Sequence, residues 1–255
     1  MTPRLGRLAR SYNPRIPHYS AITAGKALAP PPPSCDWTVG MPSDLGMLGN
    51  DVLGDCTCAG FYHAIQVWQF NIENAILPIL DSNALQLYIE ACGYDPKQGG
   101  EGPGGVEQDV LSYLLRVGAP MEPANQMRNK LAGFVEVDHR NTDDVKRTIV
   151  ECGVAYIGFD VPDYLMANGV PDVWTVQNVP ETIVGGHAVI LAGYNETAVK
   201  VISWGRTYWM TWEFFSRYTD EVYALADSSW IKANGTTPGG LTLEQLQAQM
   251  SALKG

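Results

Sequence analysis

The sequence predicts an α+β fold, with a helical half followed by a half built from antiparallel strands. From about residue 45 to 130, apolar side chains recur at spacings of three and four, which is typical of helices. From about residue 131 to 232 the chain has short runs rich in β-branched and aromatic residues, bounded by Gly, Pro and Asn. Because helices and strands follow one another in blocks, we expect two packed layers with a cleft between them.

Three regions are predicted along the chain. Residues 1–32 form a basic, proline-rich arm, residues 33–232 form the body, and residues 233–255 form a tail. The four-proline run at 30–33 must be extended, so it separates the arm from the body. The tail contains an amphipathic helix over 242–253, for which packing on the body is favoured over binding a partner helix.

Within the body, the helical half should contain the segments 56–76, 83–92 and 106–117. The first is nearly free of charge and therefore predicts a helix that is buried on most sides. The other half should begin with a short helix over 142–152, followed by strands at 154–161, 188–194 and 198–203. The pattern over 211–218 fits either a helix or an edge strand.

Composition excludes several classes of protein. With 255 residues, 45% of them hydrophobic, the chain can bury one sizeable core or two small ones. It shows neither a run of about 18 apolar residues nor an apolar segment after the first arginines, so we expect no membrane span, no secretory signal and a cytoplasmic location. The five cysteines are few and odd in number, which favours a reducing compartment.

Charge is distributed unevenly between the arm and the rest of the chain. Residues 1–35 hold five basic side chains and no acid, so the remaining 220 residues hold 12 basic and 27 acidic side chains, a net charge of −15. Such an acidic body is not expected to bind nucleic acid. The arm is interpreted as a solvated tail, with docking on an acidic partner or on the acidic body as the alternatives.

A cysteine and a histidine carry the strongest functional signal. Cys56 follows the Gly54-Asp55 turn at the start of a predicted helix, and His187 stands at the head of an apolar strand. A nucleophilic thiol requires a helix N-terminus or an imidazole to favour the thiolate. The pair therefore predicts a thiol nucleophile with its base, against the alternative of a buried structural thiol.

Other candidate sites are weaker. Cys58 should point away from the cleft, and Cys56 and His63 lie about 10 Å apart along a helix, which argues against a metal site. The segment 100–105 formally fits a Gly-x-Gly-x-x-Gly fingerprint, but a helix rather than a strand is expected before it. We therefore expect no metal and no cofactor.

Four blocks of sequence carry a resemblance to a known family. They are Pro33-Ser34-Cys35-Asp36-Trp37, the segment from Asn50 to Cys56, Gly186-His187-Ala188-Val189 with Gly193-Tyr194, and Ser203-Trp204-Gly205. In this order they resemble the papain-like cysteine peptidases, in particular the compact phage and bacterial type that has no pro-segment. The resemblance spans roughly residues 33 to 230 and implies a papain-like fold.

The resemblance also implies roles for individual residues. Cys56 and His187 become the catalytic pair, Asn50 an oxyanion donor, and Trp204 a shield for the histidine. The residues implied to bind substrate are Gly104, Gly105 and Ala188. The family's histidine-orienting asparagine is replaced by Ile202, so Ser203, Asn195, a backbone carbonyl or water would have to take its place. The arm lacks the length and the helical pattern of the family's inhibitory pro-segments.

Two functions from different classes remain open. The first is a papain-like cysteine peptidase, or a related thiol amide hydrolase or acyltransferase, acting on a peptide or protein. The second is a catalytically inactive papain-like module for binding or assembly. Such a module would suit a phage structural or accessory protein, located in the host cytoplasm or in the virion. In that case the arm or the C-terminal helix would contact the protein partner, and neither function involves nucleic acid or a membrane.

Overall fold

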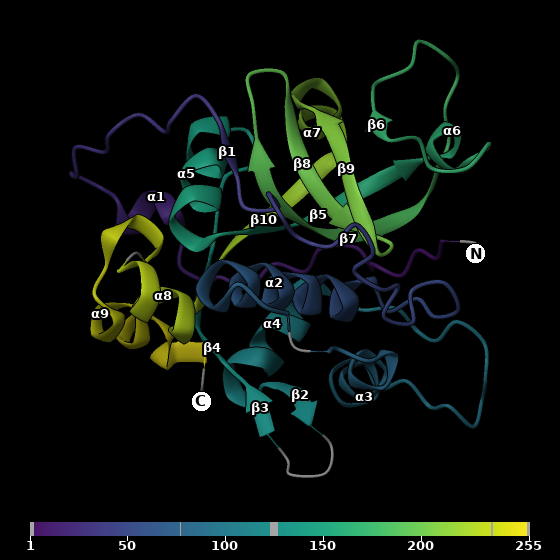
Figure 1. Ribbon diagram of the computed structural model, residues 1–255, viewed down its shortest axis with the longest axis horizontal. Helices are drawn as coiled ribbons and strands as arrows, with labels where there is room; N and C mark the ends of the chain where they lie inside the picture. Colours follow the sequence, from purple (N-terminus) through teal and green to yellow (C-terminus); the bar gives the residue numbers. More distant parts are fainter. Residues whose placement is uncertain (1–2, 77, 123–126, 236, 254–255) are drawn as a thin grey trace.

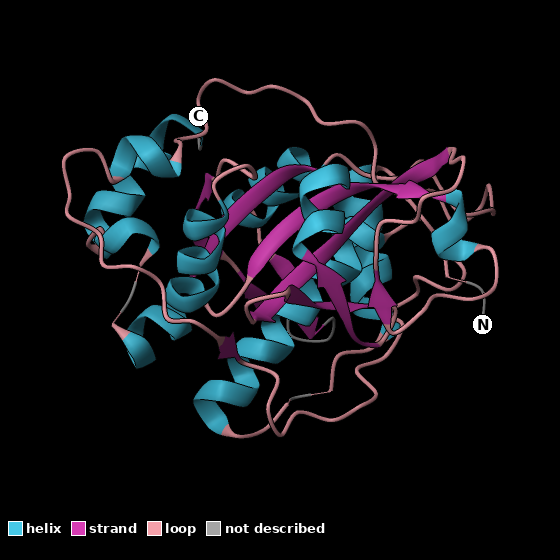
Figure 2. Ribbon diagram, turned by 90° about the horizontal axis from the view of Figure 1, so that it is seen from above, coloured by secondary structure: helices cyan, strands magenta, loops and turns pink. Residues whose placement is uncertain are grey.

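The two predicted layers meet along one long helix in the computed structural model, which describes residues 3–76, 78–122, 127–235 and 237–253. In Figure 1, helix α2 (Cys56–Glu73) crosses the middle of the molecule, with the larger sheet on one side and α3 (Asp81–Cys92) on the other. This arrangement confirms the predicted α+β class. Figure 2, a view from above, shows the strands of the sheet crossing the molecule.

The remaining elements follow in chain order. The other helices are α1 (Tyr19–Ile22), α4 (Glu107–Arg116), α5 (Thr142–Cys152), α6 (Asp163–Met166), α7 (Trp212–Tyr218), α8 (Ser228–Asn234) and α9 (Leu243–Gln249), with 3-10 turns at Pro238–Gly240 and Met250–Leu253. The strands are β1 (Cys35–Asp36), β2 (Ala119–Glu122), β3 (Met127–Asn129), β4 (Leu131–Glu136), β5 (Ala155–Pro162), β6 (Val173–Trp174), β7 (Ile183–Tyr194), β8 (Ala198–Ser203), β9 (Arg206–Thr211) and β10 (Thr219–Asp227).

Helix α2 is the buried centre of the molecule. Every side chain from Cys56 to Trp68 is buried, which explains why this stretch is nearly free of charge. Polar groups that enter the core find partners: the Trp68 indole donates to the Cys152 carbonyl at 2.7 Å. The chain leaves the helix through Asn74, which adopts the left-handed conformation common at helix C-termini. At the start of α2, the Tyr156 hydroxyl of β5 donates to the Thr57 carbonyl at 2.8 Å and holds this end against the sheet.

The larger sheet presents β7 to that helix. Its strands run in the order β4-β10-β5-β7-β8-β9-β6, and β1 pairs with β7 as well. All of these pairings are antiparallel except the one between β6 and β9. In this register His187 lies opposite Phe159 of β5, and α2 packs on β7. The sheet therefore places a histidine near the first turn of α2.

The predicted elements are largely present, with ends moved by a few residues. Segment 211–218, whose pattern fitted either a helix or an edge strand, forms helix α7. Thr211 accepts a hydrogen bond from the Phe214 N–H at the start of this helix. Strand β10 has no counterpart among the predicted strands. Its residues are mostly buried on both faces and include the acids Asp220 and Glu221, so it lacks the alternation that marks a strand.

The arm is not a solvated tail, so that interpretation is wrong and docking on the body holds instead. Ile16 and Tyr19 are buried, and the Tyr19 hydroxyl donates to Glu151 at 3.1 Å. Lys26 donates to the Gly239 carbonyl at 2.6 Å. Opposite charges explain the docking, because Arg10 forms an ion pair with Glu136 of the acidic body.

The tail packs on the body, as predicted. Helix α9 begins with the predicted capping box between Thr242 and Gln245, and Leu246 is buried against Gly133 of β4. Across the described residues, no helix combines the length and the apolar character needed to cross a membrane.

Candidate active site

Cys56 is the first residue of α2, directly after the loop that contains Gly54 and Asp55. Burial raises the pKa of its thiol to about 12, while hydrogen bonds from the backbone of Ala188 and Gly6 act in the opposite direction. The side chain is 1% exposed. The predicted nucleophile needs surroundings that favour its thiolate, so the raised pKa and the burial of Cys56 contradict that expectation for this state, in which the arm lies beside the cysteine.

His187 projects from β7 into the same buried region. Its Nε2 atom lies 2.7 Å from the Ser203 hydroxyl, and its ring stacks on Trp204 with centroids 4.2 Å apart and an interplanar angle of 14°. Burial, followed by the charge of Arg7, lowers the pKa of His187 to about 3. With the arm in place, the imidazole and the thiol are both uncharged at neutral pH.

The residue next to His187 is Ser203, one of the two side chains that the sequence offered for orienting it. Successive residues of a strand face opposite sides of the sheet. Ile202 consequently points away from the histidine into the core, where it is fully buried. Asn195, the other candidate, accepts hydrogen bonds from the N–H groups of Thr197 and Ala198 in the turn after β7.

Asn50 and Asp55 brace the loop before Cys56. The Asn50 side-chain amide donates to the Leu53 carbonyl at 3.0 Å, and its backbone carbonyl accepts from the Arg4 N–H at 2.9 Å. Asp55 is fully buried, and burial raises its pKa to about 8 against the effect of the Asn50 amide. It occupies the N-cap position of α2 without making a side-chain capping bond. The oxyanion role of Asn50 stays a prediction.

Residues 3–8, which we call the arm segment, lie in the cleft between the two layers. On the helical side, the Leu8 N–H donates to the Gly105 carbonyl at 2.9 Å and the Gly105 N–H donates to the Gly6 carbonyl at 2.8 Å. On the sheet side, the Arg7 N–H donates to the Gly186 carbonyl at 3.1 Å. Gly105, implied to bind substrate backbone, therefore binds the backbone of this chain's own arm.

Glycine is required where the arm segment crosses the cleft. A Cβ on Gly6 would overlap the Gly54 carbonyl, and a Cβ on Gly104, where φ is +78°, would overlap the Gly6 carbonyl. The fit is therefore specific to Gly6. Its N–H donates to the Gly186 carbonyl at 3.3 Å and also favours the thiolate of Cys56, whereas its carbonyl accepts from the Gly105 N–H on the other side. The Gly6 peptide therefore presents a donor to the Cys56 thiol.

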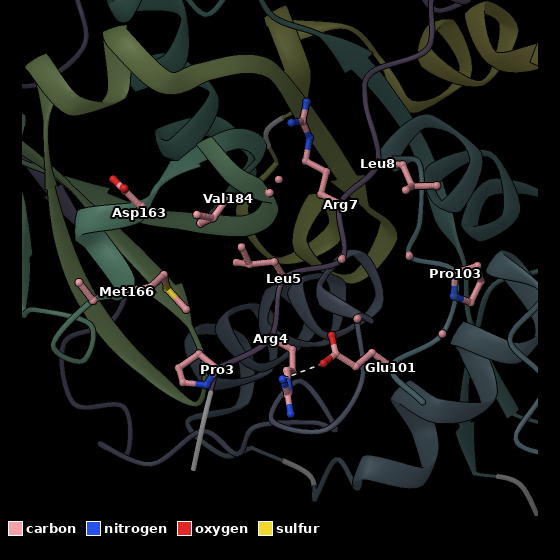
Figure 3. A pocket seen from close by; sticks show the side chains of 17 residues that line it. Pro3, Arg4, Leu5, Arg7, Leu8, Glu101, Pro103, Asp163, Met166 and Val184 are labelled. Carbon is pink, nitrogen blue, oxygen red and sulfur yellow. Dashed lines mark ion pairs between the residues drawn. The ribbon is translucent and has the colours of Figure 1, made fainter. Parts of the chain in front are cut away.

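The open side of the arm segment borders a hollow of about 590 Å³. Figure 3 shows that Arg4 forms an ion pair there with Glu101, at 2.7 Å, while the Arg7 side chain extends away from both. Trp204, predicted to shield the histidine, also donates from its indole to the Arg4 carbonyl at 3.2 Å. The indole therefore stacks on His187 and holds the arm at the same time.

Sequence reasoning missed the role of Arg7 and of the acids around it. Arg7 is buried among carboxylates that include Glu107 and Glu221, from two different elements. The only signal in the sequence was the contrast between an arm without acids and an acidic body. That contrast predicts attraction, but it does not identify which of the five basic residues is buried.

Solved structures with the same fold are papain-like cysteine proteases. Xylellain, a cysteine protease from Xylella fastidiosa, superposes with a TM-score of 0.65 at 17% identity over 89% of this chain and 97% of that one. Digestive procathepsin L 3 of the Tenebrio molitor larval midgut gives 0.56 at 15% identity, over 86% and 75%. The Carica candamarcensis protease CMS1MS2, solved in complex with E-64, gives 0.53 at 15%, over 77% and 99%.

These likenesses confirm the predicted papain-like fold. Neither a protein-family model nor a curated protein matches the sequence.

Proposed function

We propose that this papain-like chain is a thiol peptidase, or a related amide hydrolase, whose own arm segment keeps the cleft closed. The observation that carries the proposal is the position of Cys56 at the start of α2, against the strand of His187, with Ser203 bonded to the imidazole. A thiol is activated by an arrangement in which a base takes its proton and a third group orients the base.

The proposed chemistry follows from these contacts. When Ser203 accepts the Nε2–H of His187, Nδ1 is left as the basic atom, and Nδ1 is buried without a hydrogen-bond partner among the described residues. His187 takes the proton of Cys56, and the thiolate attacks the substrate carbonyl carbon. The developing oxyanion would accept the Cys56 N–H and an amide hydrogen of Asn50. His187 then protonates the leaving amine, and water hydrolyses the thioester.

The arm segment accounts for the state of the two reacting groups. It lies beside Cys56, to which it presents the Gly6 N–H, and it adds the positive charge of Arg7 near His187. Burial without water disfavours both the thiolate and the imidazolium. Displacing the arm should therefore expose the thiol and allow the ion pair to form.

Alkylation with iodoacetamide, mapped by mass spectrometry, tests this proposal. Cys56 of the wild type is expected to react slowly. In Gly6→Val the side chain cannot fit against Gly54, so Cys56 should react at least about tenfold faster, ahead of the buried Cys58 and Cys152. Arg15→Ala, which removes an exposed cation of the same arm, is the matched control and should behave as the wild type.

Adding His187→Ala to Gly6→Val should reverse the gain at neutral pH, because the thiol then loses its base. Peptide cleavage by Gly6→Val, detected on a mixed peptide library, would extend the result from reactivity to turnover. If Cys56 stays inert in Gly6→Val, or reacts equally fast with and without His187, the nucleophile assignment has to be given up.

One observation favours the second candidate function, a catalytically inactive module for binding or assembly. The cleft is already filled by a segment of the same chain, with both reacting groups uncharged. This candidate, which includes a phage accessory role, predicts that the opened variant remains unable to cleave peptides even where its Cys56 can be alkylated.

A further inference from the structure

The Arg7 side chain fills a pocket of the body lined by acids from three elements. We call it the arginine pocket and define it by Glu107 of α4, Gly158 and Asp160 of β5, and Asp220 and Glu221 of β10. The Arg7 Nε atom lies 2.8 Å from a Glu221 oxygen and 3.2 Å from a Glu107 oxygen. The side chains of Arg7, Glu107 and Glu221 are at most 1% exposed.

Contacts within the body also hold the acids of this pocket in place. The second oxygen of Glu221 accepts from the Tyr223 hydroxyl at 2.6 Å, and that hydroxyl accepts from Gln108 at 2.9 Å. Gly158 leaves the space for the guanidinium, because a Cβ there would overlap both Arg7 and Glu107. A flat, cationic group is what this space and these carboxylates fit.

The charges make the pocket selective. Burial and their mutual repulsion disfavour ionised Glu107 and Glu221, whereas the nearby guanidinium favours both charges. A neutral or apolar side chain would leave two buried acids without a cation, which is costly. Asp220 also contacts the guanidinium, from the more exposed rim of the pocket.

The position of the pocket links it to the cleft chemistry. Arg7 directly follows Gly6, the residue whose N–H lies at Cys56, and the Arg7 N–H pairs with Gly186, immediately before His187. A peptide that crosses the same cleft with a carbonyl at Cys56 would place the side chain of a neighbouring residue in the pocket. The pocket is therefore within reach of any such peptide.

We propose that the arginine pocket selects an arginine side chain next to the residue whose carbonyl meets Cys56, and that Arg7 occupies this pocket in place of a substrate. As a statement about substrate class, this inference rests on the proposed function. Its binding component can be measured without catalysis.

The binding test uses the full-length Arg7→Ala variant, in which the pocket is vacated, with ethylguanidinium as the probe and uncharged ethylurea as its control. Ethylguanidinium should raise the melting temperature of Arg7→Ala, and ethylurea should not. The effect should be absent in the wild type, where Arg7 fills the pocket, and lost in Arg7→Ala/Glu221→Gln. Equal shifts from both probes, or a shift that survives Glu221→Gln, would overturn the proposal.

A second test keeps every charged residue and does not depend on the folding of Arg7→Ala. Two acetylated tetrapeptides, Leu-Arg-Gly-Leu and Leu-Gly-Arg-Leu, are used to protect Cys56 of Gly6→Val from iodoacetamide. Each peptide is also made with citrulline, which is isosteric with arginine but neutral, in place of its arginine. For at least one of the two peptide sequences, protecting half of Cys56 should need a concentration of the citrulline peptide about 10- to 100-fold higher than that of the arginine peptide. This factor is expected for hydrogen bonds between charged groups. Gly158→Ala should abolish this difference.

The outcomes separate the two proposals. Selective protection by arginine without any cleavage would leave the arginine pocket standing and remove the peptidase. Cleavage of arginine and citrulline peptides with equal kcat/KM would leave the peptidase standing and remove the arginine pocket.

Discussion

Ser203 and Ile202 are neighbours on β8 that face opposite sides of the sheet, and this decides which of them meets His187. Ser203 lies 2.7 Å from the imidazole, whereas Ile202 is packed in the core. The Ser-Trp-Gly block thus supplies an oxygen acceptor one residue later than the position where the family resemblance implies an asparagine. Despite the departure at Ile202, His187 therefore has a hydrogen-bond partner in Ser203.

Ser203→Ala should slow Cys56 alkylation in the Gly6→Val background, because the imidazole loses the acceptor that fixes its tautomer. Deleting one hydroxyl should cost about 1 kcal/mol of unfolding free energy. The rate, followed from pH 5 to 9, should fall most near neutrality, where thiolate formation depends on the base. An unchanged pH profile would show that Ser203 is only a packing residue.

Ile202→Asn is the matched comparison on the same strand. It buries an amide in the core without reaching His187, so it should lower the unfolding free energy by about 1–3 kcal/mol and give no faster alkylation. A gain in reactivity would indicate that the asparagine does reach the histidine.

Asp55 should make the unfolding free energy of the protein depend on pH, in the direction opposite to that produced by a carboxylate in an ion pair. Its pKa is raised from 3.8 to about 8 by burial, so between these values the folded state holds a proton that the unfolded state has lost. The unfolding free energy should therefore decrease as pH rises through this window. Asp55→Asn removes this titration and should become increasingly more stable than the wild type from about pH 4 to 8. Parallel urea-unfolding curves at pH 4, 6 and 8 would contradict the assignment.

At the scale of elements, helix α2 and strand β7 divide the work of the site. The helix carries Cys56 at its N-terminus, and the strand carries His187 in its buried middle section. Each element was predicted from its apolar pattern, because both are central and nearly free of charge. Strand β10, which supplies two acids of the arginine pocket, was not predicted because those acids interrupt its apolar pattern.

Helix α9 tests whether the tail is independent of the site. Leu246 is fully buried against Gly133 of β4. Leu246→Ala should lower the unfolding free energy by about 2–5 kcal/mol, the usual range for a buried leucine, or less if the tail detaches on its own. Alkylation of Cys56 should stay as slow as in the wild type. Faster alkylation would mean that the tail helps to keep the arm segment in the cleft.

At the scale of the whole molecule, the arm joins the two layers by contacting both of them. It pairs with Gly105 on the helical side and Gly186 on the sheet side, and Tyr19 and Lys26 extend the contact toward Glu151 and Gly239. The N-terminal segment, purple in Figure 1, thus follows the junction of the layers. Gly6 is a tight position along this path, because a Cβ there would overlap the Gly54 carbonyl.

The sequence alone determined the class of the fold and the order of its layers, and it identified Cys56 and His187 as the candidate pair, because these depend on local apolar periodicity and on short motifs. The tertiary structure decided the rest: that Ser203 is the hydrogen-bond partner of His187, and that Arg7 is buried among carboxylates of the body. The first depends on strand register, and the second on contacts of Arg7 with Glu107 and Glu221, which lie 100 and 214 positions away in the sequence. No local pattern encodes such contacts, since the same basic arm could remain in water unless the acids of α4 and β10 form a pocket that fits one of its arginines.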